Sequence, residues 1–185
     1  TGRYVRMLGT ARATGWGYSL WEMVVRTRSG GTGEDGTNIA LFKPVAASSW
    51  EGGNAPAAAL DGRTTTRWSS EFADPQWLRV DLGGPATIER VVLNWEAAYA
   101  TAFQIQTSND GSNWTTIYST TSGTGGTQDI DVSGTGRYIR MYGTARSTGY
   151  GYSLWEFEVY GSVDTSSQQP TMLSGPTRPP ATTGQ

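Results

Sequence analysis

Cysteine and histidine are both missing from the 185 residues of this sequence. The first absence excludes disulfides, thiolate nucleophiles and zinc–thiolate sites, and the second removes the commonest general base and metal ligand. Lysine is nearly missing as well, because Lys43 is the only one in the chain. With a formal net charge of -2 and scattered arginines, the sequence lacks the basic stripe that neutralises phosphates. These absences exclude much catalytic chemistry and argue against a nucleic-acid partner.

Long apolar runs are also missing, since none approaches the ~18 residues that span a bilayer. The sequence opens at Thr1 with neither an initiator methionine nor a signal-peptide pattern, from which we expect a cut N-terminus. What is abundant is Gly, Thr, Ser, Trp and Tyr, a composition that suits short strands joined by many turns. The length allows one domain with extra segments.

A long repeat organises the chain. Residues 1–25 align with residues 135–159 at a constant offset of 134, and 19 of the 25 positions are identical. A period of this size exceeds that of solenoid repeats and matches a whole domain. The repeat therefore predicts that residues 1–25 are the last strands of a preceding, nearly identical module.

Two further segments read as linkers. Residues 26–37 (RTRSGGTGEDGT) are small, polar or charged, which predicts a flexible connection. Residues 162–185 hold four of the eight prolines among Thr, Ser and Gln, and lack the apolar residues that would offset the entropy of ordering. The complete module is therefore expected at residues 38–161.

Short alternating segments predict the fold of that module. In Gln76–Gly84 the apolar residues Leu78, Val80 and Leu82 alternate with polar or aromatic ones, as in a strand with one buried face. Asn109–Trp114 carries an Asp-Gly pair typical of a tight hairpin. Further segments of this kind are Thr87–Glu96, Ala102–Ser108, Trp114–Thr120, Thr127–Val132, Arg137–Gly143 and Ser153–Gly161. Their spacing indicates an all-β sandwich of antiparallel sheets.

The segments NIALFKPVAASS, AAALDGRTTTRWSS, PQWLRVDLG, TSNDGSNW and RYIRMYGTARSTGYGYSLWEFEVYG together resemble the coagulation factor 5/8 type C, or discoidin, superfamily. Within it, residues 38–161 are most similar to family 32 carbohydrate-binding modules, especially the discoidin modules of bacterial chitosanases and glucanases. The resemblance implies an eight-stranded antiparallel jelly-roll β-sandwich, a structural Ca²⁺ ion and sugar binding in the loops at one end.

The resemblance also implies a set of metal ligands. Calcium takes six to eight oxygen ligands, and a carboxylate, a hydroxyl and carbonyls on a tight turn supply several at once. Mapped onto this sequence, the set comprises side-chain oxygens of Asp61, Thr66 and Glu156 and backbone carbonyls of Ala58, Arg63 and Trp155. Arg63 departs from the family pattern, which often has Asn or Asp there, so that only its carbonyl would serve. The alternative is that Asp61 merely forms an Asp-Gly turn and Glu156 is a solvated strand residue.

Sugars are bound by stacking on aromatic rings and by hydrogen bonds from charged side chains to hydroxyls. The predicted loops contain seven candidates for these roles, which are Trp50, Glu51, Arg67, Glu71, Glu96, Tyr99 and Tyr150. Tyr152 is a further loop aromatic. Any one of the acids, taken alone, could be a solvated loop residue. The tryptophans in strand patterns, Trp68, Trp77 and Trp155, are expected to pack in the sheets. Convergence of Glu51, Glu71 and Glu96 is the hypothesis.

Function follows from these expectations. We expect a secreted, non-catalytic carbohydrate-binding module that targets a tethered glycoside hydrolase, beside a neighbouring module, to polysaccharide. Carboxylates without a compensating lysine suit cationic chitosan, and a neutral glucan remains open. Rival interpretations are a cell-surface or membrane adhesion domain, for which one lysine is poor support, and a glycoside hydrolase, for which no catalytic motif is recognisable.

Overall fold

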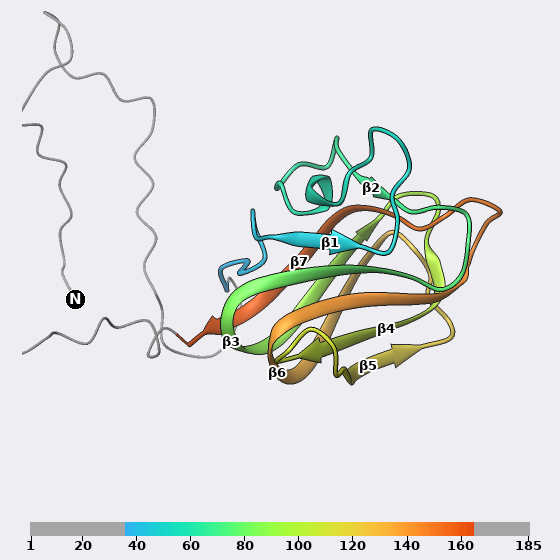
Figure 1. Cartoon of the computed structure of the whole chain (residues 1–185). Coiled ribbons are helices and arrows are strands. Elements are labelled where there is room, and N and C mark those ends of the chain that lie inside the picture. The colour runs from blue at the N-terminus through green and yellow to red at the C-terminus, as the bar shows by residue number, and fades with distance from the viewer. Residues whose placement is uncertain (1–35, 165–185) are drawn as a thin grey trace, which may run out of the picture. The chain divides into compact units, whose positions relative to one another are not determined.

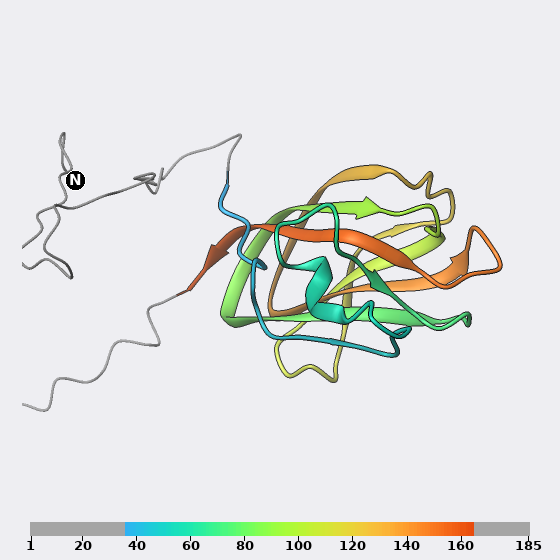
Figure 2. The same cartoon turned by 90° about the horizontal axis from the view of Figure 1, so that it is seen from above.

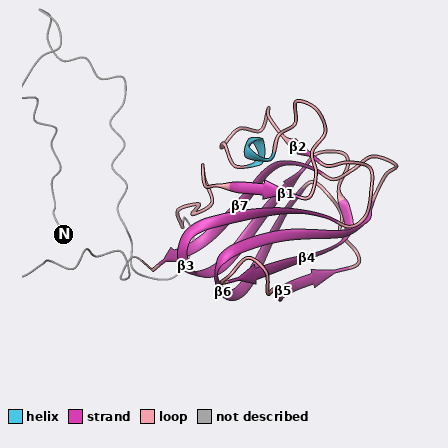
Figure 3. Cartoon of the chain, viewed as in Figure 1, coloured by secondary structure: helices cyan, strands magenta, loops and turns pink. Residues whose placement is uncertain are grey.

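The structure is a computed structural model that describes residues 36–164. The predictions for residues 1–25, and for nearly all of 26–37 and 162–185, lie outside this range. Within it the chain forms seven strands and one short 3-10 helix. They are β1 (Val45–Ala47), η1 (Pro56–Ala59), β2 (Trp68–Ser69), β3 (Gln76–Trp95), β4 (Ala100–Ser108), β5 (Thr115–Thr120), β6 (Thr127–Arg146) and β7 (Ser153–Val163). Figure 3 shows how strands and loops make up almost all of the described chain, with the helix beside β2.

All strand pairs are antiparallel, in the order β2-β7-β3-β6-β4-β5, and β1 pairs with β3. The two longest strands, β3 and β6, bend sharply, as Figure 1 shows. The first half of β3 pairs with β1 and with the second half of β6, whereas its second half pairs with β7 and with the first half of β6. Each of these strands therefore contributes to two layers, and the apolar core lies between the strand halves.

The predicted all-β, antiparallel class is confirmed, and the number of strands is seven where eight were expected. Gln76–Gly84 and Thr87–Glu96 form one strand, because the β3–β6 ladder resumes at Ala86 after a register shift. Likewise, Thr127–Val132 and Arg137–Gly143 join as β6. Glycine and proline at the bend predict a turn between two strands. In the structure they change the direction of one strand without ending it.

The alternation predicted the buried face correctly. Leu78, Val80 and Leu82 are completely buried, whereas Trp77, Arg79 and Asp81, which alternate with them, are partly exposed. Burying each such aliphatic side chain stabilises the fold by roughly 1.5–3 kcal/mol relative to exposure. Since the period of a strand is two, this burial also fixes which side chains face outward.

The first and last described segments pair with each other. Asn38 forms a bridge with Tyr160, and its side-chain oxygen accepts hydrogen bonds from the N–H groups of Ala40 (3.0 Å) and Val159 (3.1 Å). Strand β7 continues to Val163, beyond the expected module end. Figure 2 shows the described ends on the side of the molecule opposite the loop before β7. None of the helices in residues 36–164 is long and apolar enough to cross a membrane.

Candidate functional site

A groove of about 320 Å³ lies at the loop end of the strands. Four of the seven candidates from the sequence line it, namely Glu51, Arg67, Glu96 and Tyr150. They come from the loop after β1, the approach to β2, the end of β3 and the loop before β7. Small and buried residues, including Ser69, Ser153 and Tyr152, complete the lining. The structure thus brings together side chains from four distant stretches of sequence.

One charged pair is fixed within the groove. The guanidinium of Arg67 lies 3.4 Å from the Glu96 carboxylate, and both side chains are about a quarter to a third exposed, at 32% and 24%. The second oxygen of Glu96 accepts a hydrogen bond from the N–H of Ala98 (3.2 Å). Arg67 also lies over the ring of Trp155, 5.9 Å from its centroid. These contacts hold both groups in place and leave the pair without net charge.

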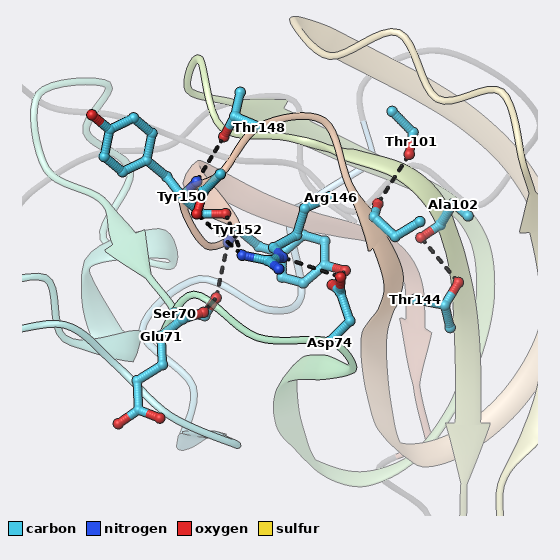
Figure 4. A network of polar contacts seen from close by, with 12 residues as sticks. Ser70, Glu71, Asp74, Thr101, Ala102, Thr144, Arg146, Thr148, Tyr150 and Tyr152 are labelled. Atoms are coloured by element: carbon cyan, nitrogen blue, oxygen red, sulfur yellow. Dashed lines mark hydrogen bonds and ion pairs between the residues drawn. The ribbon is translucent and has the colours of Figure 1, made fainter.

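Two further acids, Glu51 in the groove lining and Glu71 outside it, have no partner for their carboxylates among the described residues. The backbone of Glu51 is held by its N–H bond to the carbonyl of Ser69 (2.8 Å), and that of Glu71 by its N–H bond to Ser49 Oγ (3.0 Å). Both residues are exposed, and Figure 4 shows the Glu71 side chain pointing away from the neighbouring polar network. Glu71 is not part of the groove lining, but it directly precedes the exposed Phe72. The rim therefore carries uncompensated negative charge.

Polar contacts connect the loop that carries Tyr150 to Ser70 and Asp74 (Figure 4). The Arg146 side chain donates to Asp74 (3.1 Å) and to the carbonyls of Gly149 and Tyr150 (3.2 Å each). Asp74 also accepts a hydrogen bond from the hydroxyl of Tyr152, whose pKa is raised by burial and by this bond. The ring of Tyr150 remains 66% exposed. An aromatic ring is thus held in a defined place with its surface open to solvent.

Phe72 is a groove-side residue that the sequence analysis missed. It is 51% exposed and makes an edge-to-face contact with Tyr150, with ring centroids 5.6 Å apart and an interplanar angle of 88°. Together the two rings form an aromatic corner beside Glu71. Its position in the sequence could have indicated this role, because Phe72 lies in a loop outside any apolar alternation and follows the candidate acid Glu71.

Trp50 and Tyr99 are not among the residues that line the groove. Trp50 is 57% exposed and directly precedes Glu51, so it lies next to the rim. Tyr99 is partly buried and packs against the core, with its ring so close to Gly125 that a Cβ there would lie 2.6 Å from it. Tyr152 also lines the groove but is completely buried, so its ring offers no exposed surface for stacking.

The candidate metal ligands cluster between the loop after η1 and strand β7. Thr66 Oγ1 donates to Asp61 (2.8 Å), and the N–H of Arg63 donates both to Asp61 (2.9 Å) and to Glu156 (2.7 Å). Ala58 lies on η1 and Trp155 precedes Glu156 on β7. The loop and the last strand are thus joined through two carboxylates.

Glu156 is buried, with 3% of its surface exposed, and its second carboxylate oxygen has no hydrogen-bond partner in the structure. Burial and, to a smaller extent, the nearby Asp61 together raise the pKa of Glu156 to about 7, against the opposing effect of the Arg63 N–H. The alternative that Glu156 is a solvated strand residue is therefore wrong. A buried oxygen without a partner, beside a second carboxylate and a hydroxyl, fits a hard cation. The described residues include no group of three or more His, Cys, Asp or Glu that could hold a metal, so carbonyls would have to complete the set.

Comparison with known proteins places these residues in a family. The profile of the F5/8 type C domain matches residues 44–157, a range that contains the groove and the carboxylate cluster. The chain belongs to the F5/8 type C domain family. The predicted resemblance to discoidin and family 32 carbohydrate-binding modules is thereby confirmed.

Several solved structures are similar to this F5/8 type C domain. Chitosan-binding module 1 of a chitosanase/glucanase from Paenibacillus sp. IK-5 is 55% identical, with a TM-score of 0.66 over 69% of this chain and 100% of that one. Chitosan-binding module 2 of the same enzyme, solved with chitotriose, is 51% identical, with a TM-score of 0.66 over 67% and 100% of the two chains. A family 32 carbohydrate-binding module of AlyQ, solved with 4,5-unsaturated mannuronic acid, is 30% identical with a TM-score of 0.57, covering 64% and 95%.

One curated relative is much longer than this chain. The polysaccharide lyase 8 family protein HylA of Enterococcus faecalis is 34% identical over 110 residues, which are 54% of this chain and 8% of that protein. The chain therefore spans less than a tenth of the length of HylA.

Proposed function

We propose that residues 38–161 form a non-catalytic carbohydrate-binding module that holds a tethered polysaccharide-degrading enzyme, such as a glycoside hydrolase, on its substrate. The observation that carries this proposal is the groove, where exposed aromatic rings and carboxylates converge on one rim. The relatives at 51–55% identity that are named chitosan-binding modules support it. Such a module acts by raising local concentration, an effect that tandem copies would strengthen.

Chitosan is the ligand that the charges favour. With Arg67 and Glu96 paired, Glu51 and Glu71 leave the rim negative, which suits a polymer with protonated amines. The exposed ring of Tyr150 would stack on the C–H face of one sugar, and Phe72, which is perpendicular to it, would contact a neighbouring sugar. A neutral glucan could use the same rings, with the carboxylates accepting bonds from its hydroxyls. Binding of the two polymers is therefore to be compared directly.

Affinity electrophoresis through gels containing chitosan, laminarin, an α-1,3-glucan or a galactan tests the proposal. We expect chitosan to retard the wild-type protein and Tyr150→Ala to abolish most of the retardation. Phe42→Ala is the matched control, because Phe42 is also exposed, at 73%, but is not part of the groove. Unchanged mobility of the folded protein in every gel would contradict the proposal, and retardation by laminarin alone would assign the groove to a glucan.

We further propose a structural Ca²⁺ site at the carboxylate cluster. Side-chain oxygens of Asp61, Thr66 and Glu156 would hold the ion, with the carbonyls of Ala58, Arg63 and Trp155. The partnerless oxygen of Glu156 supports this assignment. When bound, the ion would neutralise the two carboxylates and stabilise the connection between the loop and β7. Its role would be structural, since the cluster is separate from the groove lining.

A secreted, extracellular location is part of the proposal, because insoluble polysaccharides lie outside the cell. The partners would be the polysaccharide, a catalytic domain in the parent protein and a neighbouring module. Adhesion to membranes or cell surfaces is the alternative partner class. Co-sedimentation with vesicles containing anionic lipid distinguishes the polysaccharide from the membrane interpretation. We expect that the protein does not sediment with the vesicles. Vesicle binding that is unchanged in Tyr150→Ala would favour the membrane interpretation.

A further inference from the structure

The outward side of one layer carries a second cluster of aromatic and charged residues, distinct from the groove. Because Leu78 and Val80 face the core, Trp77 and Arg79 face outward on β3. The register pairs Trp77 with Tyr142 and Arg79 with Arg140 on β6. We call this surface the arginine face, defined by Trp77, Arg79, Trp114, Tyr138, Arg140 and Tyr142.

Both arginines of this face are stacked against rings. The Arg79 guanidinium lies 5.7 Å from the ring centroid of Trp77 and 5.6 Å from that of Tyr138. That of Arg140 lies 4.0 Å from the centroid of Trp114 and 4.9 Å from that of Tyr142. Stacking occupies the flat faces of a guanidinium and leaves the N–H donors at its edge available in fixed directions.

Within the described part of the chain, neither of these guanidinium groups forms an ion pair with an acid, although the charge of Arg79 acts on Asp81. Nearby Asp81 is engaged by Arg137, which donates to both of its oxygens at 2.9 and 2.8 Å. No ion pair within residues 36–164 involves Arg79 or Arg140. Arg140 donates its Nε–H to the amide oxygen of Gln106 (2.6 Å), which leaves its terminal nitrogens free of protein acceptors. The face therefore carries two positive charges that are not in ion pairs with described residues, and Asp81, which is paired with Arg137, offsets part of that of Arg79.

The two charges also oppose each other. Like charges directly opposite on neighbouring strands destabilise a sheet. Burial lowers the pKa of Arg140, and the positive charge of Arg79 lowers it further. An oxyanion bound between the two groups would relieve this repulsion and accept hydrogen bonds from both.

We propose that the arginine face binds the carboxylate groups of an acidic polysaccharide, a polymer of uronic acid residues. A planar carboxylate matches the edge of a guanidinium, and the flanking rings offer contacts to sugar C–H groups. A polymer is favoured because the outward side of adjacent strands is an open surface, in contrast to the groove. The sign of the charge separates the two sites, since the groove rim is acidic and the arginine face is basic.

Affinity electrophoresis in polygalacturonate at low and moderate salt tests this proposal. We expect retardation that weakens with salt and falls at least tenfold in Arg79→Gln. Arg79→Lys, which keeps the charge and loses the planar edge, should recover only part of it. Arg90→Gln is the matched control, because Arg90 also stacks on a ring, that of Tyr160 at 4.1 Å, but pairs with Asp129 and lies outside the face. Tyr150→Ala should leave binding to polygalacturonate unchanged. The test of the arginine face is therefore independent of the test of sugar binding in the groove.

A second readout does not require a variant. Titration with galacturonate oligomers should shift the indole N–H signals of Trp77 and Trp114 in NMR spectra, while that of Trp68, which is buried, stays in place. Absence of retardation at low salt, an equal loss in Arg90→Gln, or equal affinity for dextran sulfate would overturn the proposal. The last result would show attraction to any polyanion in place of carboxylate recognition.

Discussion

The carboxylate of Glu156 on the last strand accepts a hydrogen bond of 2.7 Å from the N–H of Arg63, 93 residues earlier in the chain. This bond satisfies one oxygen of a buried acid, and the other oxygen is left without a partner. A loop near the start of the module and its final strand therefore meet at a point where negative charge is buried. The stability of the fold should depend on what neutralises that charge.

Calcium should stabilise the protein, and Glu156→Gln should remove the response. For the wild type we expect Tm to rise with added Ca²⁺ and to fall with EGTA. At a free Ca²⁺ concentration of a hundred times the dissociation constant, the free energy of unfolding should increase by about 2.7 kcal/mol. Glu156→Gln no longer buries a charge, so in EGTA its Tm should match or exceed that of the wild type, without a shift on adding Ca²⁺. Differential scanning calorimetry measures both. Glu89→Gln, an exposed change on β3, should keep the full calcium response.

The charge of the rim should govern the choice of ligand. Glu71→Gln removes one unpartnered carboxylate, so we expect weaker binding to chitosan, by about tenfold, and less dependence on salt. Binding to neutral laminarin, if present, should change little. Isothermal titration calorimetry with chitosan oligomers at two salt concentrations measures the effect. An equal loss for both polymers would show that Glu71 acts through hydrogen bonding alone.

The network behind Tyr150 should matter for binding as well as for stability. Tyr152→Phe removes the hydroxyl that donates to Asp74, and we expect a loss of about 1–3 kcal/mol of stability and a few-fold weaker chitosan binding. Tyr160→Phe is the matched control, since Tyr160 donates to Glu158 away from the groove. It should lower Tm without changing affinity. If both variants bind equally well, the network does not position the loop.

Acid should weaken the pair formed by Asp81 and Arg137. The hydrogen bond from Arg137 lowers the pKa of Asp81, and this effect outweighs burial. A depressed folded-state pKa contributes stability above the unfolded value of about 3.9, and this contribution is lost as pH falls through the folded value. Asp81→Asn should lower Tm at pH 7 by at most about 4 °C and make no difference at pH 2, as measured by thermal denaturation. Equal destabilisation at both values would show that the pair acts through packing.

Much of the site could be predicted because its charged and aromatic residues lie in loops where the sequence gives them nothing to pack against. Acids and a tyrosine in Gly-rich loops have no packing role, and Glu51, Arg67, Glu96 and Tyr150 do converge on one groove. The family resemblance located the loops from which they come. Whether these residues bind sugar stays a prediction.

The rest depended on tertiary packing that local patterns do not encode. The network of Arg146, Asp74 and Tyr152 joins two loops, and nothing in the sequence around Asp74 indicates its partners. The continuity of β3 through its bend is decided by pairing with β6 and β7. The stacking of Arg79 and Arg140 became visible only once the register placed the two strands side by side.

The loop before β7, which contributes to the groove lining, and the ends of the described range lie on opposite sides of the described domain (Figure 2). A polysaccharide bound at the loops that line the groove would therefore not contact residues 36 and 164, where the described domain continues into the rest of the chain. Under the proposed function, binding at the loops and attachment to the parent protein would not compete for space, so an attached enzyme could act on nearby polysaccharide while the module stays bound.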